Sequence, residues 1–142
     1  MEEKVTDCGH WLCDIDVPVG TYGFIYEIES LRTGQKYIGK KQMSTIRKMA
    51  PLKGRKNKRH KIVETDWKSY TGSCNILNEE IEQDGKHNFV FTILRLCSCK
   101  WELSYFEAKL QFERDVLLSD KYYNGIINLR VGKAPKEFRI NG

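Results

Sequence analysis

Two short segments joined by a turn constrain the fold of this chain more than any other feature. Residues 22–30 alternate in side-chain character with the period of a β-strand. Residues 32–35 have the composition of a turn, and residues 36–39 have that of a returning strand. We therefore expect a β-hairpin. One face of its first strand would carry Tyr22, Phe24, Tyr26 and Ile28.

Residues 100–118 carry the clearest helical pattern. One apolar stripe consists of Leu103, Phe106, Leu110 and Leu117, and a second, on the opposite side, of Trp101, Tyr105, Ala108 and Phe112. A helix that is apolar on two sides is usually packed between other elements. Weaker patterns predict a short helix over 43–49, a helix from an N-cap at Ser73 to about Gln83 with Gly85 past its end, and a strand over 88–97.

A chain of 142 residues fits one domain with its own core. The order of elements predicts an α/β domain of the α+β kind, with a small mixed or antiparallel sheet flanked by helices. We expect an irregular lead-in over 1–20, the main domain over 21–130 with a basic loop at 50–64, and a basic C-terminal tail over 131–142.

Positive charge is concentrated in one part of the chain. Residues 32–61 hold twelve Lys or Arg and no Asp or Glu, although the whole chain carries a net charge of only +5. Such a segment favours a phosphate backbone as partner, because bound lysines and arginines release condensed counterions. A solvated loop and a contact for an acidic protein are the alternatives. The candidate nucleic-acid-binding residues are Lys41, Lys53, Arg55, Lys56, Lys58, Arg59, His60 and Lys61.

The start of the chain has no charged and apolar pattern of a secretory signal, and no run is long enough to span a bilayer. We expect an intracellular, cytoplasmic protein. Its five cysteines then default to reduced thiols. Cys8, His10 and Cys13, with Cys97 and Cys99, could form a structural zinc site, but their spacings fit no common zinc module, so free cysteines are favoured.

Glu107 stands out in the helix over 100–118, because it lies at the edge of an apolar stripe while Glu102 and Glu113 project farther from its centre. A carboxylate against apolar surface needs a partner, and a divalent cation is one. A stripe-edge glutamate that pairs with Lys109 or Arg114 is the alternative. By pattern alone, Tyr26 and Tyr37 are ordinary strand aromatics, and Gly39 is a strand terminator.

The hairpin also resembles the paired signature of the GIY-YIG nuclease family. Ile25-Tyr26 fills the end of the first triplet, with Phe24 where the family has glycine and Gly23 one residue earlier, and Tyr37-Ile38-Gly39 supplies the second triplet. Family members then carry an arginine, a helical glutamate and an asparagine, which match Arg47, Glu107 and Asn124. Residues 67–73 resemble a segment of phage-borne members. The resemblance spans residues 22–128.

This resemblance implies a DNA endonuclease of the phage or homing type, which uses one Mg²⁺ or Mn²⁺ ion in attack by water on phosphorus. Glu107 would bind the metal, Arg47 would clamp a phosphate oxygen, and Tyr26 would orient or deprotonate the water. Help for Tyr26 would come from Lys40 and Lys41, Tyr37 would contact the phosphate or water, and Asn124 would support the site.

One family position has no direct counterpart. Many members place a histidine or tyrosine a few residues after the arginine, where this chain has Pro51. His60 or Tyr70 could substitute, and Tyr70 is preferred. DNA is the expected partner, bound by a monomer or a homodimer. The rival functions are a GIY-YIG-like module that binds DNA without cutting it and a structure-selective repair nuclease.

Overall fold

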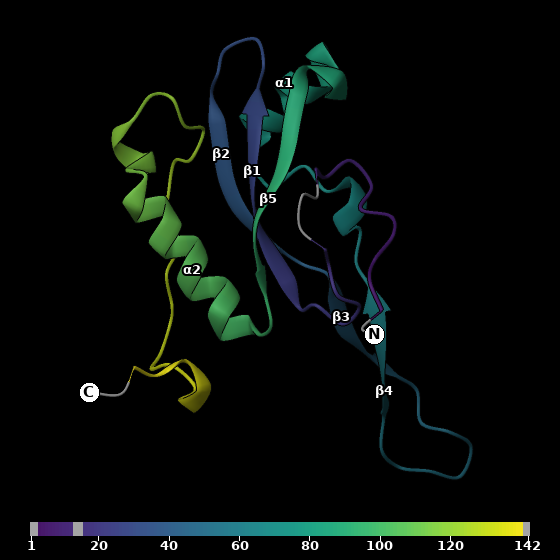
Figure 1. Cartoon of the computed structure of the whole chain (residues 1–142). Coiled ribbons are helices and arrows are strands. Elements are labelled where there is room, and N and C mark those ends of the chain that lie inside the picture. Colours follow the sequence, from purple (N-terminus) through teal and green to yellow (C-terminus); the bar gives the residue numbers. More distant parts are fainter. Residues whose placement is uncertain (1–2, 13–15, 141–142) are drawn as a thin grey trace.

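The computed structural model describes residues 3–12 and 16–140. Its centre is an antiparallel sheet in the order β2-β1-β5, formed by β1 (Gly23–Ser30), β2 (Lys36–Gln42) and β5 (Phe89–Cys97) (Figure 1). The expected hairpin of β1 and β2 is confirmed, and so is the third strand. The turn closes with the Gly34 N–H donating to the Ser30 carbonyl over 2.8 Å, where Gly34 has a φ of 75°.

Strand β1 is central and buried on both faces. Because the sheet is antiparallel and helices pack against it, the domain has the expected α+β fold. Helix α2 (Lys100–Glu113) covers one face, where Leu103 packs with Ile25 and Ile38. The opposite face carries an aromatic cluster that includes Trp11 and Trp67. Helix α1 (Asn75–Asp84) packs into the same cluster through Leu77 and Ile81. The described residues before the hairpin, 3–12 and 16–22, are irregular, but Trp11 and Val17 among them belong to the core.

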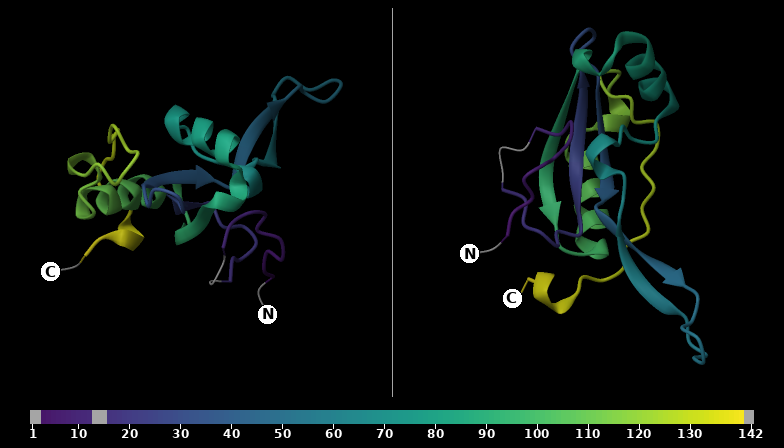
Figure 2. Two further views of the ribbon diagram at one scale, coloured as in Figure 1. Left: turned by 90° about the horizontal axis from the view of Figure 1, so that it is seen from above. Right: turned by 90° about the vertical axis from the view of Figure 1, so that its right-hand side faces the viewer.

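A second sheet of two strands projects from the body as an arm (Figure 2). It consists of β3 (Ser44–Met49) and β4 (Arg59–Glu64), and we call residues 44–64 the arm. The short helix expected over 43–49 is therefore wrong. The β-branched Thr45 and Ile46 favour an extended backbone, and β4 pairs with β3 along its whole length, with Arg47 opposite Lys61. The expected basic loop is thus part strand.

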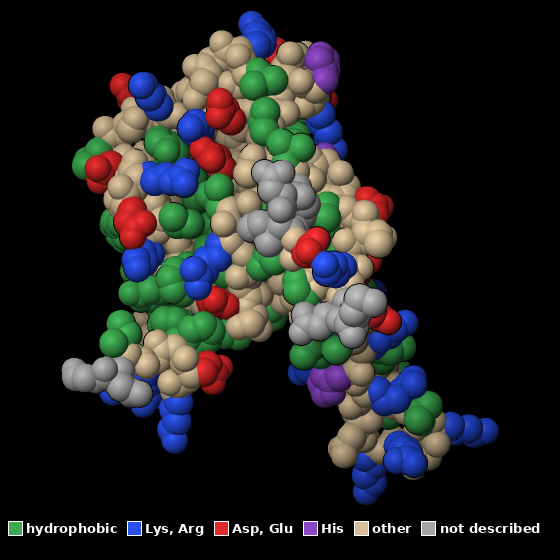
Figure 3. Space-filling model, in the orientation of Figure 1, with side chains coloured by type: hydrophobic (Ala, Val, Ile, Leu, Met, Phe, Trp, Pro, Cys, Tyr) green, Lys and Arg blue, Asp and Glu red, His purple; other side chains and the backbone are tan. Residues whose placement is uncertain are grey.

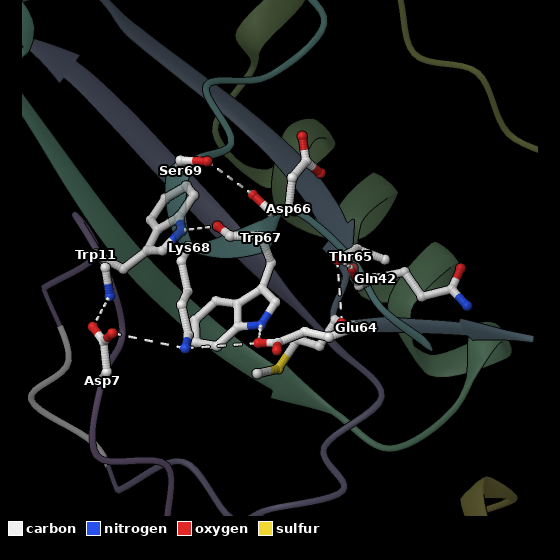
Figure 4. A network of polar contacts seen from close by, with 11 residues as sticks. Asp7, Trp11, Gln42, Glu64, Thr65, Asp66, Trp67, Lys68 and Ser69 are labelled. Atoms are coloured by element: carbon white, nitrogen blue, oxygen red, sulfur yellow. Dashed lines mark hydrogen bonds and ion pairs between the residues drawn. The ribbon is translucent and has the colours of Figure 1, made fainter. Parts of the chain in front are cut away.

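The base of the arm is fixed to the body by a polar network around Trp67 (Figure 4). Trp67 is buried, and its indole N–H donates to the Glu64 carboxylate over 2.8 Å. The Thr65 hydroxyl donates to the Gln42 carbonyl over 2.6 Å, and the Trp11 indole donates to the Trp67 carbonyl over 2.5 Å. These bonds join β2, β4 and the N-terminal segment, so the arm leaves the body at a fixed point.

The helices differ in detail from the sequence pattern. Cys74, and not Ser73, is the N-cap of α1, while Gly85 ends it as expected with a φ of 86°. Helix α2 stops at Glu113, and a separate 3₁₀ turn follows over Val116–Leu118. Its second apolar stripe is not enclosed, because Tyr105 and Phe112 are exposed. Among the described residues, no helix combines the length and apolar character needed to cross a membrane.

The outer edge of β2 carries no further strand in the described part of the chain, and the segment after α2 runs beside it instead. The Lys36 N–H donates to the Lys121 carbonyl, and the Tyr123 N–H donates to the Lys36 carbonyl, each over 2.8 Å. Beyond this bridge a side chain, that of Asn124, continues the pairing. The edge of the sheet is therefore partly closed and partly available to a ligand.

Candidate active site

A pocket of about 320 Å³ opens at this edge of the sheet. It takes side chains from both faces of the sheet, because β2 is the edge strand and both faces meet there. The Tyr26 face contributes three tyrosines, the α2 face contributes Glu107, and the segment after α2 closes the side. The lining residues are Tyr26, Tyr37, Lys40, Tyr70, Ser73, Glu107, Gln111, Asn124, Ile126 and Asn128.

Tyr26 reaches this pocket across its own cross-strand partner. In the register of β1 and β2, Tyr26 lies opposite Gly39, and a Cβ on Gly39 would stand 2.5 Å from the Tyr26 hydroxyl. Gly72 makes a similar approach, because a Cβ there would lie 3.1 Å from the same hydroxyl. Gly39 is thus no strand terminator. The absence of side chains at two glycines lets the phenol cross the strand.

A bulge in the pairing of β1 with β5 falls beside Tyr26. Ile25 is opposite Arg95 whereas Tyr26 is opposite Ile93, so β5 has one extra residue at this point. Bulges change the direction of neighbouring side chains and are frequent next to active sites. The bulge increases the local twist where the Tyr26 ring turns toward the β2 edge.

The other two tyrosines stand around Tyr26. The Tyr37 ring centre is 6.2 Å from that of Tyr26, and the Tyr70 ring meets it edge-on at 6.1 Å. The Tyr37 hydroxyl also lies 3.5 Å from the Ser73 hydroxyl. Burial raises the pKa of Tyr26 well above its usual range, and burial likewise raises that of Tyr37. Both phenols are therefore neutral hydrogen-bond donors at ordinary pH.

On α2, Glu102 is buried and Glu107 is largely buried, and the two carboxylates have opposite environments. The Glu102 carboxylate accepts hydrogen bonds from the Ser98 N–H over 2.6 Å and from Arg95 over 3.0 Å. Burial opposes its ionisation, but these bonds outweigh burial and lower the pKa of Glu102. Glu102 was expected to project farther from the centre of the apolar stripe than Glu107, and the structure shows it buried against Ser98 and Arg95 at the first turn of α2.

Glu107 has no such set of donors. Its side chain is 14% exposed, and the nearest cation among the described residues is the Lys40 ammonium, 4.0 Å from a carboxylate oxygen. Burial raises the pKa of Glu107, although Lys40 acts in the opposite direction. The expected pairing partners Lys109 and Arg114 instead contact Glu113 and Glu27. A buried carboxylate with a raised pKa in a pocket is a candidate functional group.

The two lysines after Tyr37 have separate roles. Lys40 lies in the pocket beside Glu107, and its ammonium donates to the Ser104 hydroxyl over 3.2 Å. Lys41 lies on the other face, where its ammonium is 2.8 Å from the Asp66 carboxylate and 4.0 Å above the Tyr70 ring. Lys40 therefore supplies positive charge to the pocket, whereas Lys41 holds Tyr70 in place.

Asn124 is 8% exposed and both ends of its amide are used. Its oxygen accepts from the Ile38 N–H over 3.1 Å, and its nitrogen donates to the Ile38 carbonyl over 2.8 Å. The Gln111 amide donates to the same carbonyl over 2.9 Å. Asn124 thus imitates a neighbouring strand, which fixes β2 at the residue between Tyr37 and Gly39.

The structure brings six of the expected site residues together at the pocket, and Arg47 is not among them. The six are Tyr26, Tyr37, Lys40, Tyr70, Glu107 and Asn124. Arg47 is exposed on β3, in the arm. His60 is exposed on β4, also in the arm. Of the two candidates for the position after the arginine, only Tyr70 is thus placed at the pocket.

Four lining residues were not among the expected ones: Ser73, Gln111, Ile126 and Asn128. Gln111 carried a usable signal, because it follows Glu107 by one helical turn and so lies on the same face of α2. Ser73 was noticed only as a helix cap. Ile126 and Asn128 lie in an irregular segment whose path no local pattern indicates.

The donor set of the pocket fits a hard divalent cation held by one carboxylate. Among the described residues, no three His, Cys, Asp or Glu side chains gather in a way that could hold a metal. Glu107 is a single carboxylate surrounded by hydroxyl and amide groups, and Mg²⁺ accepts such sites because it retains several waters. Cys13, part of the suggested zinc site, lies outside the described residues. Burial raises the pKa of Cys97, another residue of that site, to about 12, which disfavours the thiolate that zinc binds.

Comparison with known families agrees with this arrangement. A family model described as "Putative endonuclease segE, GIY-YIG domain" matches residues 11–127, which is most of the chain. Searches of curated proteins and of solved structures gave no match. A hairpin with two tyrosines facing a helical glutamate defines a nuclease of the GIY-YIG class. The chain belongs to this endonuclease family.

Proposed function

We propose that this protein is a phage-type or homing-type DNA endonuclease that hydrolyses phosphodiester bonds with one Mg²⁺ or Mn²⁺ ion. The observation that carries the proposal is the pocket that joins Tyr26, Tyr37 and Lys40 to the buried, weakly paired carboxylate of Glu107. The segment 67–73, which resembles phage-borne members, supports the type, because Tyr70 and Ser73 form one side of this pocket.

Glu107 would hold the metal, with the remaining positions open to water and to phosphate oxygens. When bound, the ion would offset negative charge on the phosphate and lower the pKa of an attached water. The raised pKa of Glu107 supports this role, because a cation at the carboxylate would relieve the cost of ionising it in a buried place.

Tyr26 is proposed to act as a neutral phenol that positions the attacking water. Burial keeps its pKa high, so it is unsuited to be a phenolate base. Lys41 does not assist ionisation, because its charge is directed to Asp66 and Tyr70. Tyr37 would donate to a phosphate oxygen, and Lys40 would supply positive charge beside the scissile phosphate.

The arm is proposed to hold the duplex. Every residue from 51 to 62 is exposed, and Lys and Arg side chains project from the arm tip (Figure 3). Arg47 lies directly opposite Lys61 across the ribbon, and like charges in that position destabilise a sheet unless an anion lies between or beside them. A DNA backbone would supply that anion, so Arg47 would contact a phosphate away from the cleaved one.

Neutralising the arm tip should change the salt dependence of DNA binding. We expect that alanine at Arg55, Lys56, Lys58 and Arg59 lowers the slope of log affinity against log salt by about 2–4, because each lost phosphate contact removes about 0.9. Fluorescence anisotropy with a labelled duplex between 50 and 200 mM salt, roughly the range in which such slopes are measured, checks this. An unchanged slope would remove the arm from the binding surface.

Cleavage of supercoiled plasmid in Mg²⁺, with an EDTA control, tests the proposed activity. We expect nicked or linear products only with the divalent ion, and sequencing of the ends then gives the position of each cut. A protein that shifts plasmid mobility without cutting it would be a binding module. Flap and junction substrates distinguish a repair nuclease, which would cut them in preference to an intact duplex.

A further inference from the structure

A second and larger depression, with a volume of about 690 Å³, lies between the arm and the start of α2. We call it the arm groove. It adjoins the pocket at Lys40, whose side chain lines both. Its lining residues include Lys40, Lys41 and Lys100 as well as Ile46 and Ile62 of the arm.

The arm groove is basic. Lys40, Lys41 and Lys100 line it, and none of its lining residues is an Asp or a Glu. Lys41 is partly neutralised by Asp66, but Lys100 is exposed and takes part in none of the ion pairs seen among the described residues. Lys40 is shared with Glu107, 4.0 Å away, so Lys100 is the groove cation that has no acidic partner among the described residues.

The wall formed by the arm is apolar. Ile46 and Ile62 are cross-strand partners, 66% and 75% exposed. The cost of exposing two large β-branched side chains on a two-stranded ribbon would fall if a ligand covered them. Lysines on one wall and an isoleucine pair on the other match the two parts of a DNA strand, namely its phosphates and its sugars and bases.

We infer that the arm groove holds the strand that is cut, on one side of the cleavage point, with phosphates at Lys40 and Lys100 and sugars or bases against Ile46 and Ile62. This inference rests on the proposed nuclease function. It adds Lys100, in the first turn of α2, and the isoleucine pair as residues that position the substrate. The arm is then one wall of the substrate channel as well as a clamp on the duplex.

Lys100→Ala tests the inference, with Lys109→Ala as the matched control. Lys109 lies on the same helix, but it lines an outer pocket with Tyr105 and Phe112. We expect Lys100→Ala to weaken duplex binding about three- to tenfold and to lower the salt slope by about one. Lys109→Ala should leave both unchanged. Equal effects of the two substitutions would show that bulk charge alone acts, and would overturn the inference.

The isoleucine pair gives an independent readout. The double substitution Ile46→Thr with Ile62→Thr keeps β-branched residues in the ribbon. It should weaken binding about fivefold without changing the salt slope, because apolar contacts release no counterions. An unchanged affinity, in a variant whose circular dichroism and melting match the wild type, would place the DNA elsewhere.

Neutral methylphosphonate linkages locate the strand once the cut position is known. Replacing the phosphates on the groove side of the cut should weaken binding of the wild type more than binding of Lys100→Ala. Equal weakening of both would overturn the inference. The binding measurements with Lys100→Ala and Lys109→Ala, unlike the methylphosphonate series, do not require cleavage. A wild type that binds but never cuts would therefore refute the nuclease proposal and leave the arm groove to be judged by the Lys100 and Lys109 comparison alone.

Discussion

Replacement of Glu107 by glutamine is expected to abolish DNA cleavage while DNA binding persists. Glutamine keeps the size and hydrogen-bonding capacity of the side chain but removes its charge, so a divalent ion would lose its only carboxylate in the pocket. We expect single-turnover cleavage to fall by at least about 10³-fold. Duplex affinity measured with EDTA present should stay within about twofold, because the arm supplies the cationic contacts.

Glu102 provides a matched control on the same helix. Glu102→Gln should lower stability, because the carboxylate holds Ser98 and Arg95, but cleavage at a temperature where the variant is folded should continue. If Glu107→Gln still cleaved DNA at the wild-type rate in a metal-dependent way, another group would hold the metal. Loss of activity in both variants at matched folded fractions would mean that α2 geometry matters and the Glu107 charge does not.

The same Glu107→Gln variant should be more stable than the wild type in metal-free buffer near pH 7. The folded protein raises the pKa of Glu107, so the protonated carboxyl favours folding below the ordinary value of 4.5, and this contribution is lost as the pH rises through the raised pKa. We expect a melting temperature roughly 2–6 °C higher than that of the wild type at neutral pH and no difference near pH 4. Added Mg²⁺ should then stabilise only the wild type.

Replacement of Gly39 by alanine should damage both stability and activity. The new Cβ would stand 2.5 Å from the Tyr26 hydroxyl and 2.9 Å from the Tyr37 ring. Tyr26 is only 1% exposed and has aromatic neighbours on several sides, so it cannot swing away without disturbing the core. We expect a loss of about 2–3 kcal/mol in the free energy of unfolding and about 100-fold in cleavage rate.

Gly125→Ala is the matched control for this substitution. A Cβ on Gly125 would meet nothing within 4 Å, although the residue directly follows Asn124. Urea unfolding and plasmid cleavage should therefore be close to wild type for Gly125→Ala. If Gly39→Ala were equally harmless, the close approach of Tyr26 to β2 would be incorrect, and Tyr26 would not reach the pocket across that strand.

The sequence predicted the sheet better than it predicted the arm. The alternation of side-chain character over residues 22–30 and the turn composition before residue 36 are local signals. Together they correctly predicted the β1–β2 hairpin. Residues 43–49 have only a weak local signal for a strand, namely the β-branched Thr45 and Ile46. Their strand form depends on β4, whose partner residues lie beyond the tip of the arm. The pairing of two strands that are separated by a long loop cannot be predicted from the sequence of one strand alone.

Most of the candidate site residues were predicted from a family resemblance. The structure then showed the contacts that explain why these residues form a site. Periodicity placed Glu107 at the edge of an apolar stripe, but it also placed Glu102 farther out, where the structure buries it with donors. The difference between the two carboxylates lies in residues brought from β5 and β2, namely Arg95 and Lys40. Sequence spacing along one helix has no information about those neighbours.

The Asn124 contact with Ile38 has a consequence for when the proposed nuclease activity could arise during synthesis. A ribosome that has made the hairpin has not yet made Glu107, and the edge of β2 stays without its amide clamp until residue 124 has also emerged. An unfinished chain would already carry the basic arm and would be harmless to the strands it touches. Synthesis itself would thus delay the proposed cutting function until residue 124 has been added.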